Sequence, residues 1–322
     1  MFDRILLLTD LSDVTRLTFK PLARIATAFD SKVTIFHAFR GSSELFYLEG
    51  EAARLLSLID DADADRARPT LDAYVQELAA LGVEADVRIR AGSFFDLAVQ
   101  VMHETQADLV VIPTQGHHEF TGRVLGSTVA RILRDTDVPV LTVNERFGER
   151  AAEWSNFGHV LYPADLSARD GQPVLHAAED MTAEFGGRVE VVHVVEPIHT
   201  QTLQTPEGEI LLPKDLQYQI KSRFQAQLSE IAHTVTRVPS CWQLIEDHKP
   251  GSGLMTYADR HAVDLIVLPA LSRDQTRNTV LGSVAEHVIK HARCPVLTLR
   301  GPFAVQAADA AAAPGASQGE PA

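Results

Sequence analysis

ADLVVIPTQG at residues 107–116 returns as VDLIVLPALS at residues 263–272, and this repeated stretch decides the fold. The two copies are 156 residues apart. Four further pairs of segments repeat at this offset or at one residue less: 5–12 with 160–167, 33–39 with 189–195, 124–133 with 280–289, and 138–143 with 294–299. Self-similarity at a fixed distance over most of a chain is the signature of a duplication, so the sequence predicts two copies of one domain.

Each copy alternates short apolar runs with longer stretches of helical periodicity. The runs in the first copy are ILLLT, VTIF, VRI, LVVI and VLTV, and those in the second are VLY, VEVV, WQLI, LIVL and VLTL. Short apolar, β-branched runs separated by helices are typical of parallel strands that are buried on both faces. We therefore predict the α/β fold class, with two tandem doubly wound parallel five-stranded sheets.

Changes in composition indicate where the domains begin and end. The first domain is expected over residues 1–145 and the second over residues 156–302, with the polar segment 144–155 between them. Residues 303–322 are rich in Ala, Pro, Gly and Gln without apolar periodicity, and we predict a disordered tail there.

The connections between the expected strands carry further signals. The segments 40–72 and 197–222 are longer than typical connections, so they are expected to form extra helices over the sheet edge or the mouth of a site. Ser12 and Ser167 each follow an Asp by two residues and are expected to cap the next helix. Pro21 is expected to delay or kink the first helix.

Composition and charge exclude several classes of function. The 322 residues include 43 Asp and Glu against 29 Lys and Arg, which gives a formal net charge of −14. Nucleic-acid binding depends on clustered basic residues, so no nucleic acid is expected as a partner. The opening MFDRILLLTD has an apolar core too short for a signal peptide or a membrane span, which predicts a cytoplasmic protein with no membrane partner. The two cysteines, Cys241 and Cys294, fit neither a zinc-ligand spacing nor a disulfide framework.

The residues that follow the strands are candidates for a binding site, because open parallel sheets bind ligands beyond the carboxyl ends of their strands. In the first domain these residues are Asp10, Ala38, Gly126 and Ser127. A Gly-Ser pair that opens a helix presents free backbone N–H groups and a hydroxyl at the positive end of the helix dipole, which favours an anion. The counterparts in the second domain are Asp165, Val194, Gly282 and Ser283.

The order of elements, the Asp after the first strand, the His at the end of the second strand and the Gly-x9-Gly-Ser loop before the last helix resemble the universal stress protein family. The resemblance covers both copies and leaves out the tail. In nucleotide-binding members the loop reads G-x2-G-x9-G-[ST]. The resemblance implies a Rossmann-like fold of the adenine nucleotide alpha hydrolase-like type and a stress-response protein that binds AMP or ATP, with Mg²⁺ as an accompanying ion. It also implies that Asp10 and Ala38 lie near adenine and ribose, and that Gly116, Gly126 and Ser127 form the phosphate loop.

Both copies depart from this motif. Pro113 and Pro269 stand at the first motif glycine, and Ser272 stands at the second glycine of the second copy. Proline lacks a backbone N–H and fixes φ, and a Cβ at Ser272 disfavours positive φ, so each change weakens a phosphate cradle. We therefore expect the first domain to bind adenine nucleotide in preference to the second.

Other patterns point to structure rather than to chemistry. The acidic run Asp60–Asp65 resembles the start of a calcium loop but lacks the central Gly, so we expect a solvated acidic segment. The residues His117–Glu119 and the pair His287 and His291 are expected to be exposed rather than metal ligands. Gly251–Gly253 lacks the GxSxG pattern of hydrolases and is expected to form a turn.

Two functional hypotheses stay open. The first is a regulatory protein whose interaction with an unidentified protein partner depends on a bound adenine nucleotide. The second is a degenerate module that has lost nucleotide binding and serves as a small-ligand or protein-interaction scaffold. The sequence offers no positioned nucleophile and base, so we expect no catalytic residues and no enzyme. The last strand of each copy would be an exposed edge, which is a liability unless it is paired. In the family that the chain resembles, these strands pair single-domain subunits, and the resemblance therefore implies that the two pair within this chain as a pseudo-dimer, with a homo-oligomer left open.

Overall fold

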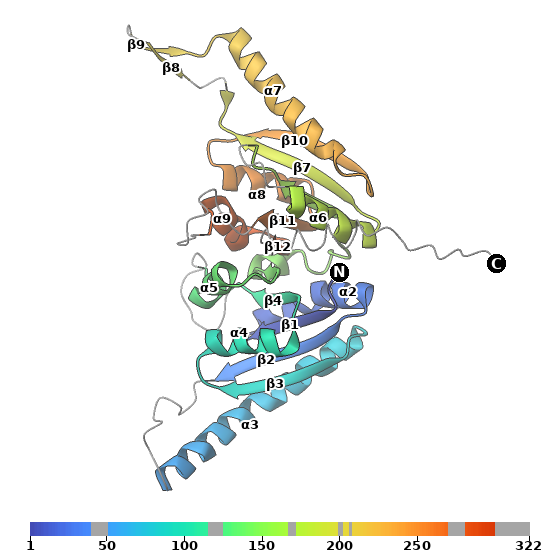
Figure 1. Ribbon diagram of the computed structural model, residues 1–322, viewed down its shortest axis with the longest axis vertical. Coiled ribbons are helices and arrows are strands. Elements are labelled where there is room, and N and C mark those ends of the chain that lie inside the picture. Colours follow the sequence, from blue (N-terminus) through green and yellow to red (C-terminus); the bar gives the residue numbers. More distant parts are fainter. Residues whose placement is uncertain are drawn as a thin grey trace, which may run out of the picture.

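The computed structural model describes residues 1–39, 51–114, 125–166, 172–198, 202–205, 208–269 and 281–299. Ten strands in this part of the chain form one sheet, in the order β10-β7-β6-β11-β12-β5-β4-β1-β2-β3. Helices lie against both faces of the sheet (Figure 1). The predicted α/β fold class is confirmed.

The first domain contributes five of these strands, and every neighbouring pair among them is parallel. Their bounds are β1 Arg4–Thr9, β2 Lys32–Phe39, β3 Ala85–Ala91, β4 Leu109–Pro113 and β5 Val140–Val143. The five apolar runs predicted from the sequence lie within these five strands. In β1 and β4 the side chains on both faces of the strand are buried, as a near-continuous apolar run requires.

The second domain repeats this arrangement, again with parallel neighbours. Its strands are β6 His159–Pro163, β7 Arg188–Val195, β10 Ser240–Glu246, β11 Leu265–Pro269 and β12 Val296–Leu299. Their order, β12-β11-β6-β7-β10, is that of β5-β4-β1-β2-β3 in the first domain. The duplication read from the sequence is therefore a duplication of topology.

The two five-stranded sheets meet at β5 and β12, which pair antiparallel with Leu141 opposite Leu297. The domains consequently lie one above the other in Figure 1. The expected pairing of the two last strands within one chain is confirmed, and neither β5 nor β12 is left as an edge.

Two buried clusters hold helices to the sheet. Alternate residues of β1 show the division, since Ile5 and Leu7 belong to the first cluster and Leu6 and Leu8 to the second. The first cluster includes α2 Phe19–Phe29, α3 Glu51–Ala80, α6 Gln172–Glu184 and α7 Lys214–His233. The second includes α4 Phe94–Thr105, α5 Ser127–Asp135, α8 Pro250–Arg260 and α9 Ser283–His291.

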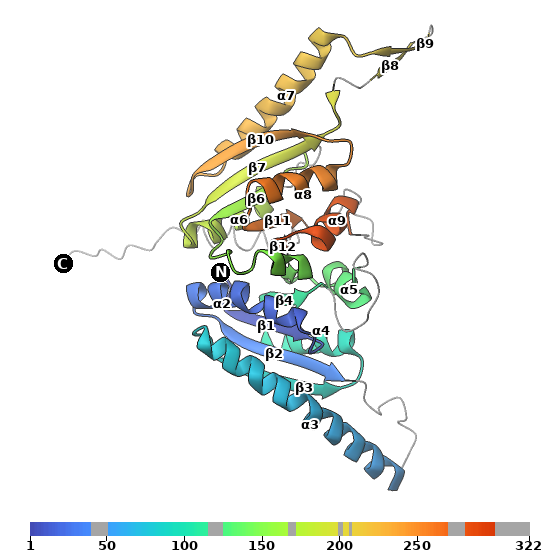
Figure 2. The same ribbon diagram turned by 180° about the vertical axis from the view of Figure 1, so that it is seen from behind.

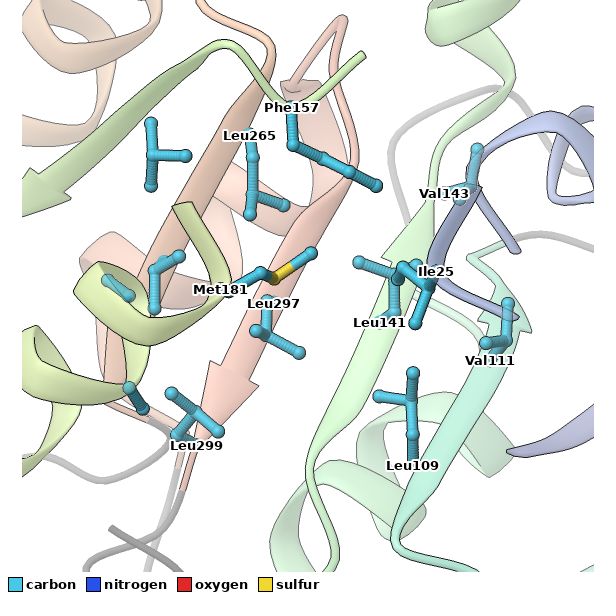
Figure 3. Packing of buried hydrophobic residues seen from close by; sticks show 14 of the residues in the cluster. Ile25, Leu109, Val111, Leu141, Val143, Phe157, Met181, Leu265, Leu297 and Leu299 are labelled. Carbon is cyan, nitrogen blue, oxygen red and sulfur yellow. The ribbon is translucent and has the colours of Figure 1, made fainter. Parts of the chain in front are cut away.

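The first cluster continues across the boundary between the domains. In Figure 3, Ile25 of α2 lies beside Leu141 and Met181 of α6 lies beside Leu297. The rings of Phe29 and Phe185, one from each domain, are also in edge contact, with their centroids 6.4 Å apart. The two domains thus share a hydrophobic core.

The segment between the domains is packed rather than loose. It begins with a 3₁₀ helix, η2 Glu145–Glu149, and continues to Trp154, whose ring is buried. The indole N–H of Trp154 donates to the carbonyl oxygen of Asp264 at 3.0 Å, and Arg150 donates to the carbonyl oxygen of Val263 at 2.5 Å. These bonds attach the connecting segment to the second domain.

Two local expectations were wrong. Gly251–Gly253 lies in the first turn of α8 rather than in a turn after a strand, because Pro250 at the first helical position starts a helix. Ser12 does not cap: a short helix, α1 Val14–Leu17, follows it, but Asp13 is the N-cap residue and no side chain caps the helix. The counterpart Ser167 lies outside the described residues.

The predictions for Pro21 and for the long connections agree better with the structure. Pro21 lies in the first turn of α2, which starts only after a break at Thr18, so the expected delay is confirmed. Helices α3 and α7 cover part of the segments 40–72 and 197–222. A hairpin, β8 Thr202–Thr205 with β9 Gly208–Leu211, precedes α7 and was not expected (Figure 2). The predicted tail at 303–322 lies outside the described residues.

No helix in the described ranges is long and apolar enough to cross a membrane.

Candidate functional site

The strand order of the first domain creates a site at the carboxyl ends of its central strands. From β1 the chain moves to β2 on one side, and it later returns to β4 on the other side. Thr9 lies opposite His37 in the neighbouring strand, and Leu7 lies opposite Val111 of β4. The ends of β1, β2 and β4 therefore meet at one edge, and ligands of doubly wound sheets bind where the strand order reverses.

Asp10 stands in a tight turn immediately after β1. Its Oδ1 accepts a hydrogen bond from the backbone N–H of Ser12 at 3.0 Å. Thr9 Oγ1 accepts from the backbone N–H of Leu11 at 2.9 Å. These bonds hold Leu11 at φ +66°, a left-handed conformation that is rare for a bulky side chain and that collects at functional turns.

His37 and Ala38 mark the end of β2. His37 is buried, and its Nδ1 donates to the carbonyl oxygen of Thr9 at 2.9 Å, which ties β2 to β1. Burial lowers the pKa of His37, although the bond to Thr9 and the charge of Asp10 act in the opposite direction. A neutral imidazole committed to a carbonyl is a structural group, and it sets the backbone of Ala38 at the site edge.

The loop after β4 leads to the start of α5. Pro113 ends β4 opposite Val143, and the N–H of Thr114 donates to the carbonyl oxygen of Val143 at 3.0 Å. Gly126 is the N-cap residue of α5, and its own N–H reaches the carbonyl oxygen of Thr114 at 3.4 Å. The exposed Ser127 opens the helix, so the N–H groups of its first turn, which have no carbonyl partner within the helix, lie next to the end of β4. Gly116 lies outside the described residues.

Two hydroxyl groups at this edge were not expected from the sequence as site groups. Ser12 Oγ and Thr114 Oγ1 are buried, and neither has a hydrogen-bond partner within the described part of the chain. The sequence did contain a signal for Thr114. Pro113 lacks the backbone N–H of the first motif glycine, and the next residue along the chain carries a hydroxyl that can donate a hydrogen bond.

The corresponding edge of the second domain is built similarly. His193 Nδ1 donates to the carbonyl oxygen of Ala164 at 2.8 Å, as His37 does to Thr9, and this bond fixes the end of β7 beside β6. Asp165 is exposed directly after this point, and Val194 follows His193 in β7. Burial, together with the charge of Asp165, raises the pKa of Tyr162 to about 12.

The second phosphate-loop candidate also stands at a helix start. Gly282 is the N-cap residue of α9, and Ser283 is exposed at its first position. Pro269 ends β11, while Ser272 lies outside the described residues. The structure therefore brings each described candidate of either domain to the carboxyl edge of its own half of the sheet.

The other patterns do not form a site in the described residues. Asp60–Asp65 lies on α3, so the acidic run is helical rather than a calcium loop. The rings of His287 and His291 are 4.5 Å apart on α9. Among the described residues, no group of three His, Cys, Asp or Glu side chains is placed to hold a metal ion. The residues His117–Glu119 lie outside this part of the chain.

Comparison with known proteins identifies one family in both halves. The family model described as "Universal stress protein family" matches residues 1–144 and again residues 156–300. Universal stress protein A homolog 1 of Coxiella burnetii is 30% identical over 144 residues, which are 45% of this chain and 96% of that protein. A universal stress protein of Methanocaldococcus jannaschii is 30% identical over 151 residues, 45% of this chain and 86% of its own length.

Solved structures support the fold over nearly the whole chain. A universal stress protein from Archaeoglobus fulgidus superimposes with a TM-score of 0.64 at 17% identity, covering 92% of this chain and 98% of that one. A putative universal stress protein from Pseudomonas aeruginosa gives a TM-score of 0.59 at 16% identity, covering 96% and 98%.

Proposed function

The chain belongs to the universal stress protein family, with the family domain in each half, and from that premise we propose that it is a stress-response regulatory protein that binds an adenine nucleotide, AMP or ATP, in its first domain. The observation that carries the proposal is the convergence of Asp10, the Ala38 backbone and the start of α5 at the reversal of strand order. Such an edge combines hydrogen-bonding groups for a nucleoside with free helix N–H groups for its phosphates.

Each group has a role in this proposal. The backbone at Ala38 faces adenine, and Asp10 lies near the ribose, in accord with the family pattern. Gly126 and Ser127 contact phosphate through N–H groups at the positive end of α5. Mg²⁺ binds proteins through one or two carboxylates together with phosphate oxygens, and Asp10 is the carboxylate at this edge that fits such a role.

The first domain is preferred over the second for a physical reason. Both domains have a proline at the first motif glycine, but Gly116 keeps the second motif glycine in the first domain, where the second domain has Ser272. A glycine accepts positive φ and lets the backbone approach a phosphate closely. We expect about one nucleotide per chain on this ground.

Isothermal titration calorimetry with AMP, ADP and ATP tests the proposal. Gly126→Asp places a carboxylate at the start of α5, and it should abolish binding by repulsion of phosphate. A Cβ at Gly126 would meet Thr114 O at 3.6 Å and Val129 at 3.7 Å, ordinary contacts, so the variant should still fold. Gly282→Asp is the matched control and should bind as the wild type does. Wild-type protein that binds none of the three nucleotides would contradict the proposal.

A second candidate is a module that has lost nucleotide binding and acts as a scaffold for a small ligand or a protein. Pro113 and Pro269, which end β4 and β11 without the N–H of a motif glycine, favour this reading. Native mass spectrometry distinguishes the two, since a co-purified metabolite other than a nucleotide would support the scaffold. In either case we propose a binding protein in the cytoplasm that acts through a protein partner, not a hydrolase. Phosphate release from ATP that disappears in Asp10→Ala would contradict that.

A further inference from the structure

We infer that the hydroxyl groups of Thr114 and Ser12 are ligand-binding groups of the first domain, and that Thr114 supplies the phosphate loop with the hydrogen-bond donor that Pro113 lacks. The inference rests on the proposed nucleotide site and adds two residues to it. It starts from two buried hydroxyls that have no partner within the described residues.

These two groups are unusual because buried polar atoms in native proteins are almost always paired. Ser12 is 5% exposed and Thr114 is 1% exposed. An unpaired buried hydroxyl destabilises the folded state, since it gives up its hydrogen bonds to water and gains none in return. Two such groups in one domain call for a partner that the described part of the chain does not provide.

Both groups stand at the reversal of strand order. Thr114 follows β4 directly, and its carbonyl oxygen lies 3.4 Å from the N–H of Gly126 at the start of α5. Ser12 follows β1 by three residues, with its N–H held by Asp10. Its carbonyl oxygen accepts from the Tyr74 hydroxyl at 3.2 Å and from the N–H of Thr15 at 3.0 Å. The backbone of Ser12 is thus fully engaged, and its hydroxyl is the group left for a ligand.

The chemistry of the loop explains why Thr114 matters. A phosphate loop works by presenting N–H donors, and Pro113 has none. The N–H of Thr114 is not available either, because it donates to Val143 within the sheet. The Thr114 hydroxyl is the next donor along the chain. Protein atoms cover both hydroxyl oxygens, so ligand binding requires each side chain to turn about χ1, and this turn breaks no hydrogen bond.

The second domain lacks the counterpart of the Thr114 hydroxyl. At the same 156-residue offset, the residue that corresponds to Thr114 is Ala270, which has no hydroxyl. The side chain of Ala270 therefore cannot replace the backbone N–H donor that Pro269 lacks. This asymmetry agrees with nucleotide binding in the first domain.

The test compares three conservative variants by calorimetric titration with ATP and by thermal unfolding without ligand. Thr114→Val and Ser12→Ala remove the unpaired hydroxyls. Each should weaken ATP binding by about tenfold or more, as expected for a hydrogen bond to a charged group. Each should leave the unfolding temperature of the ligand-free protein unchanged or higher, because the lost hydroxyl has no hydrogen-bond partner among the described residues.

The matched control is Thr136→Val. The Thr136 hydroxyl is also buried but donates to the carbonyl oxygen of Ile132 at 2.8 Å, so its removal should lower the unfolding temperature and leave ATP affinity unchanged. If the wild type binds ATP and Thr114→Val binds it equally well, the inference is wrong while the proposed function stands. If Thr114→Val lowers the unfolding temperature of the free protein, the hydroxyl is a structural group and the inference is also overturned. Wild-type protein without ATP binding overturns both.

Discussion

Leu297 of the second domain lies directly opposite Leu141 of the first, and both side chains are fully buried between the two halves of the sheet (Figure 3). Both leucines belong to a buried cluster that draws its residues from the two domains. A single copy of this domain would leave its last strand exposed as an edge unless it met a second molecule. Here the duplication places the partner in the same chain, so the edge is covered at any protein concentration.

Leu297→Ala should destabilise the whole molecule and not only the second domain. A large-to-small change at a fully buried leucine costs about 2–5 kcal/mol, because transfer energy is lost and a cavity is left. Since the core crosses the boundary, urea unfolding followed by fluorescence and by circular dichroism should give one coincident transition at lower urea. Leu211→Ala is the control: Leu211 is 65% exposed, and its loss should change stability by about 0.5 kcal/mol or less. Two separate transitions in the wild type would show that the domains unfold independently.

Gly251→Ala should destabilise the protein although alanine is the better helix former by about 1 kcal/mol. A Cβ on Gly251 would lie 2.8 Å from the ring of His287 and 2.9 Å from its Cβ, so α8 and α9 would have to move apart. We expect a net loss of about 1–3 kcal/mol in the free energy of unfolding, the usual cost of overpacking. Gly148→Ala, whose Cβ would meet Leu17 at an ordinary 3.5 Å, should be nearly neutral. Equal behaviour of the two variants in urea unfolding would contradict this account.

The central strands could be predicted from the sequence because their apolar runs are largely buried on both faces, as VVI in β4 illustrates. The runs in the edge strands β3 and β10 are only partly buried and were recognised by their apolar, β-branched composition. The helix α8 could not, because its start reads Pro-Gly-Ser-Gly, a composition typical of a turn. The glycines serve packing instead, since Gly251 lies against the ring of His287 in α9 and Gly253 lies against Asp247, and these spatial neighbours do not follow from the sequence pattern. The hairpin of β8 and β9 was also missed, since its residues 208–211 are exposed and carry no strong apolar pattern.

The sequence could predict where the candidate site residues lie in the fold, but not which hydrogen bonds their side chains make. Asp10 and Gly126 follow strands that the sequence identifies, and the fold brings such residues to one edge. That the hydroxyls of Ser12 and Thr114 lack a partner among the described residues depends on which neighbours reach them in space, and a linear pattern does not contain that information. Ser12 in particular reads as a helix cap until Asp13 is seen to occupy that place.

His37 should make the protein less stable in mild acid. Burial lowers the pKa of His37 in the folded state, so the unfolded chain binds its proton more readily. This contribution is complete above the ordinary histidine pKa of about 6.5, and it is lost as the pH falls through that value toward the folded pKa, with a slope of at most about 1.4 kcal/mol per pH unit. His37→Asn can keep the N–H donor to Thr9 and has no imidazole to protonate. Urea unfolding at pH 7.5, 6.5 and 5.5 should give a flatter profile for this variant, and an unchanged slope would exclude His37 as the source.

Tyr257→Phe should lower the stability of the protein, because it removes a hydrogen bond to the buried carboxylate of Glu190 in the second domain. Tyr257 donates to Glu190 Oε1 at 2.5 Å, and His159 Nε2 lies 2.7 Å from Glu190 Oε2. Burial raises the pKa of Glu190, but the bonds from His159 and Tyr257 outweigh it and leave that pKa below its ordinary value. The carboxylate therefore stabilises the fold at pH 7, and this contribution is lost as the pH falls through its folded pKa.

Removing the Tyr257 hydroxyl should cost about 1.5–3 kcal/mol at pH 7, the range for a hydrogen bond to a charged group. At pH 4 the deficit relative to the wild type should be smaller, because loss of the hydroxyl raises the pKa of Glu190 in the variant above that in the wild type, so the variant takes up a proton more readily as the pH falls. Tyr218→Phe is the matched control, since Tyr218 is 74% exposed and its hydroxyl should contribute about 0.5 kcal/mol or less. Urea unfolding of both variants at pH 7 and pH 4 measures the difference. A deficit for Tyr257→Phe that is equal at the two pH values would mean that the bond does not depend on the charge of Glu190.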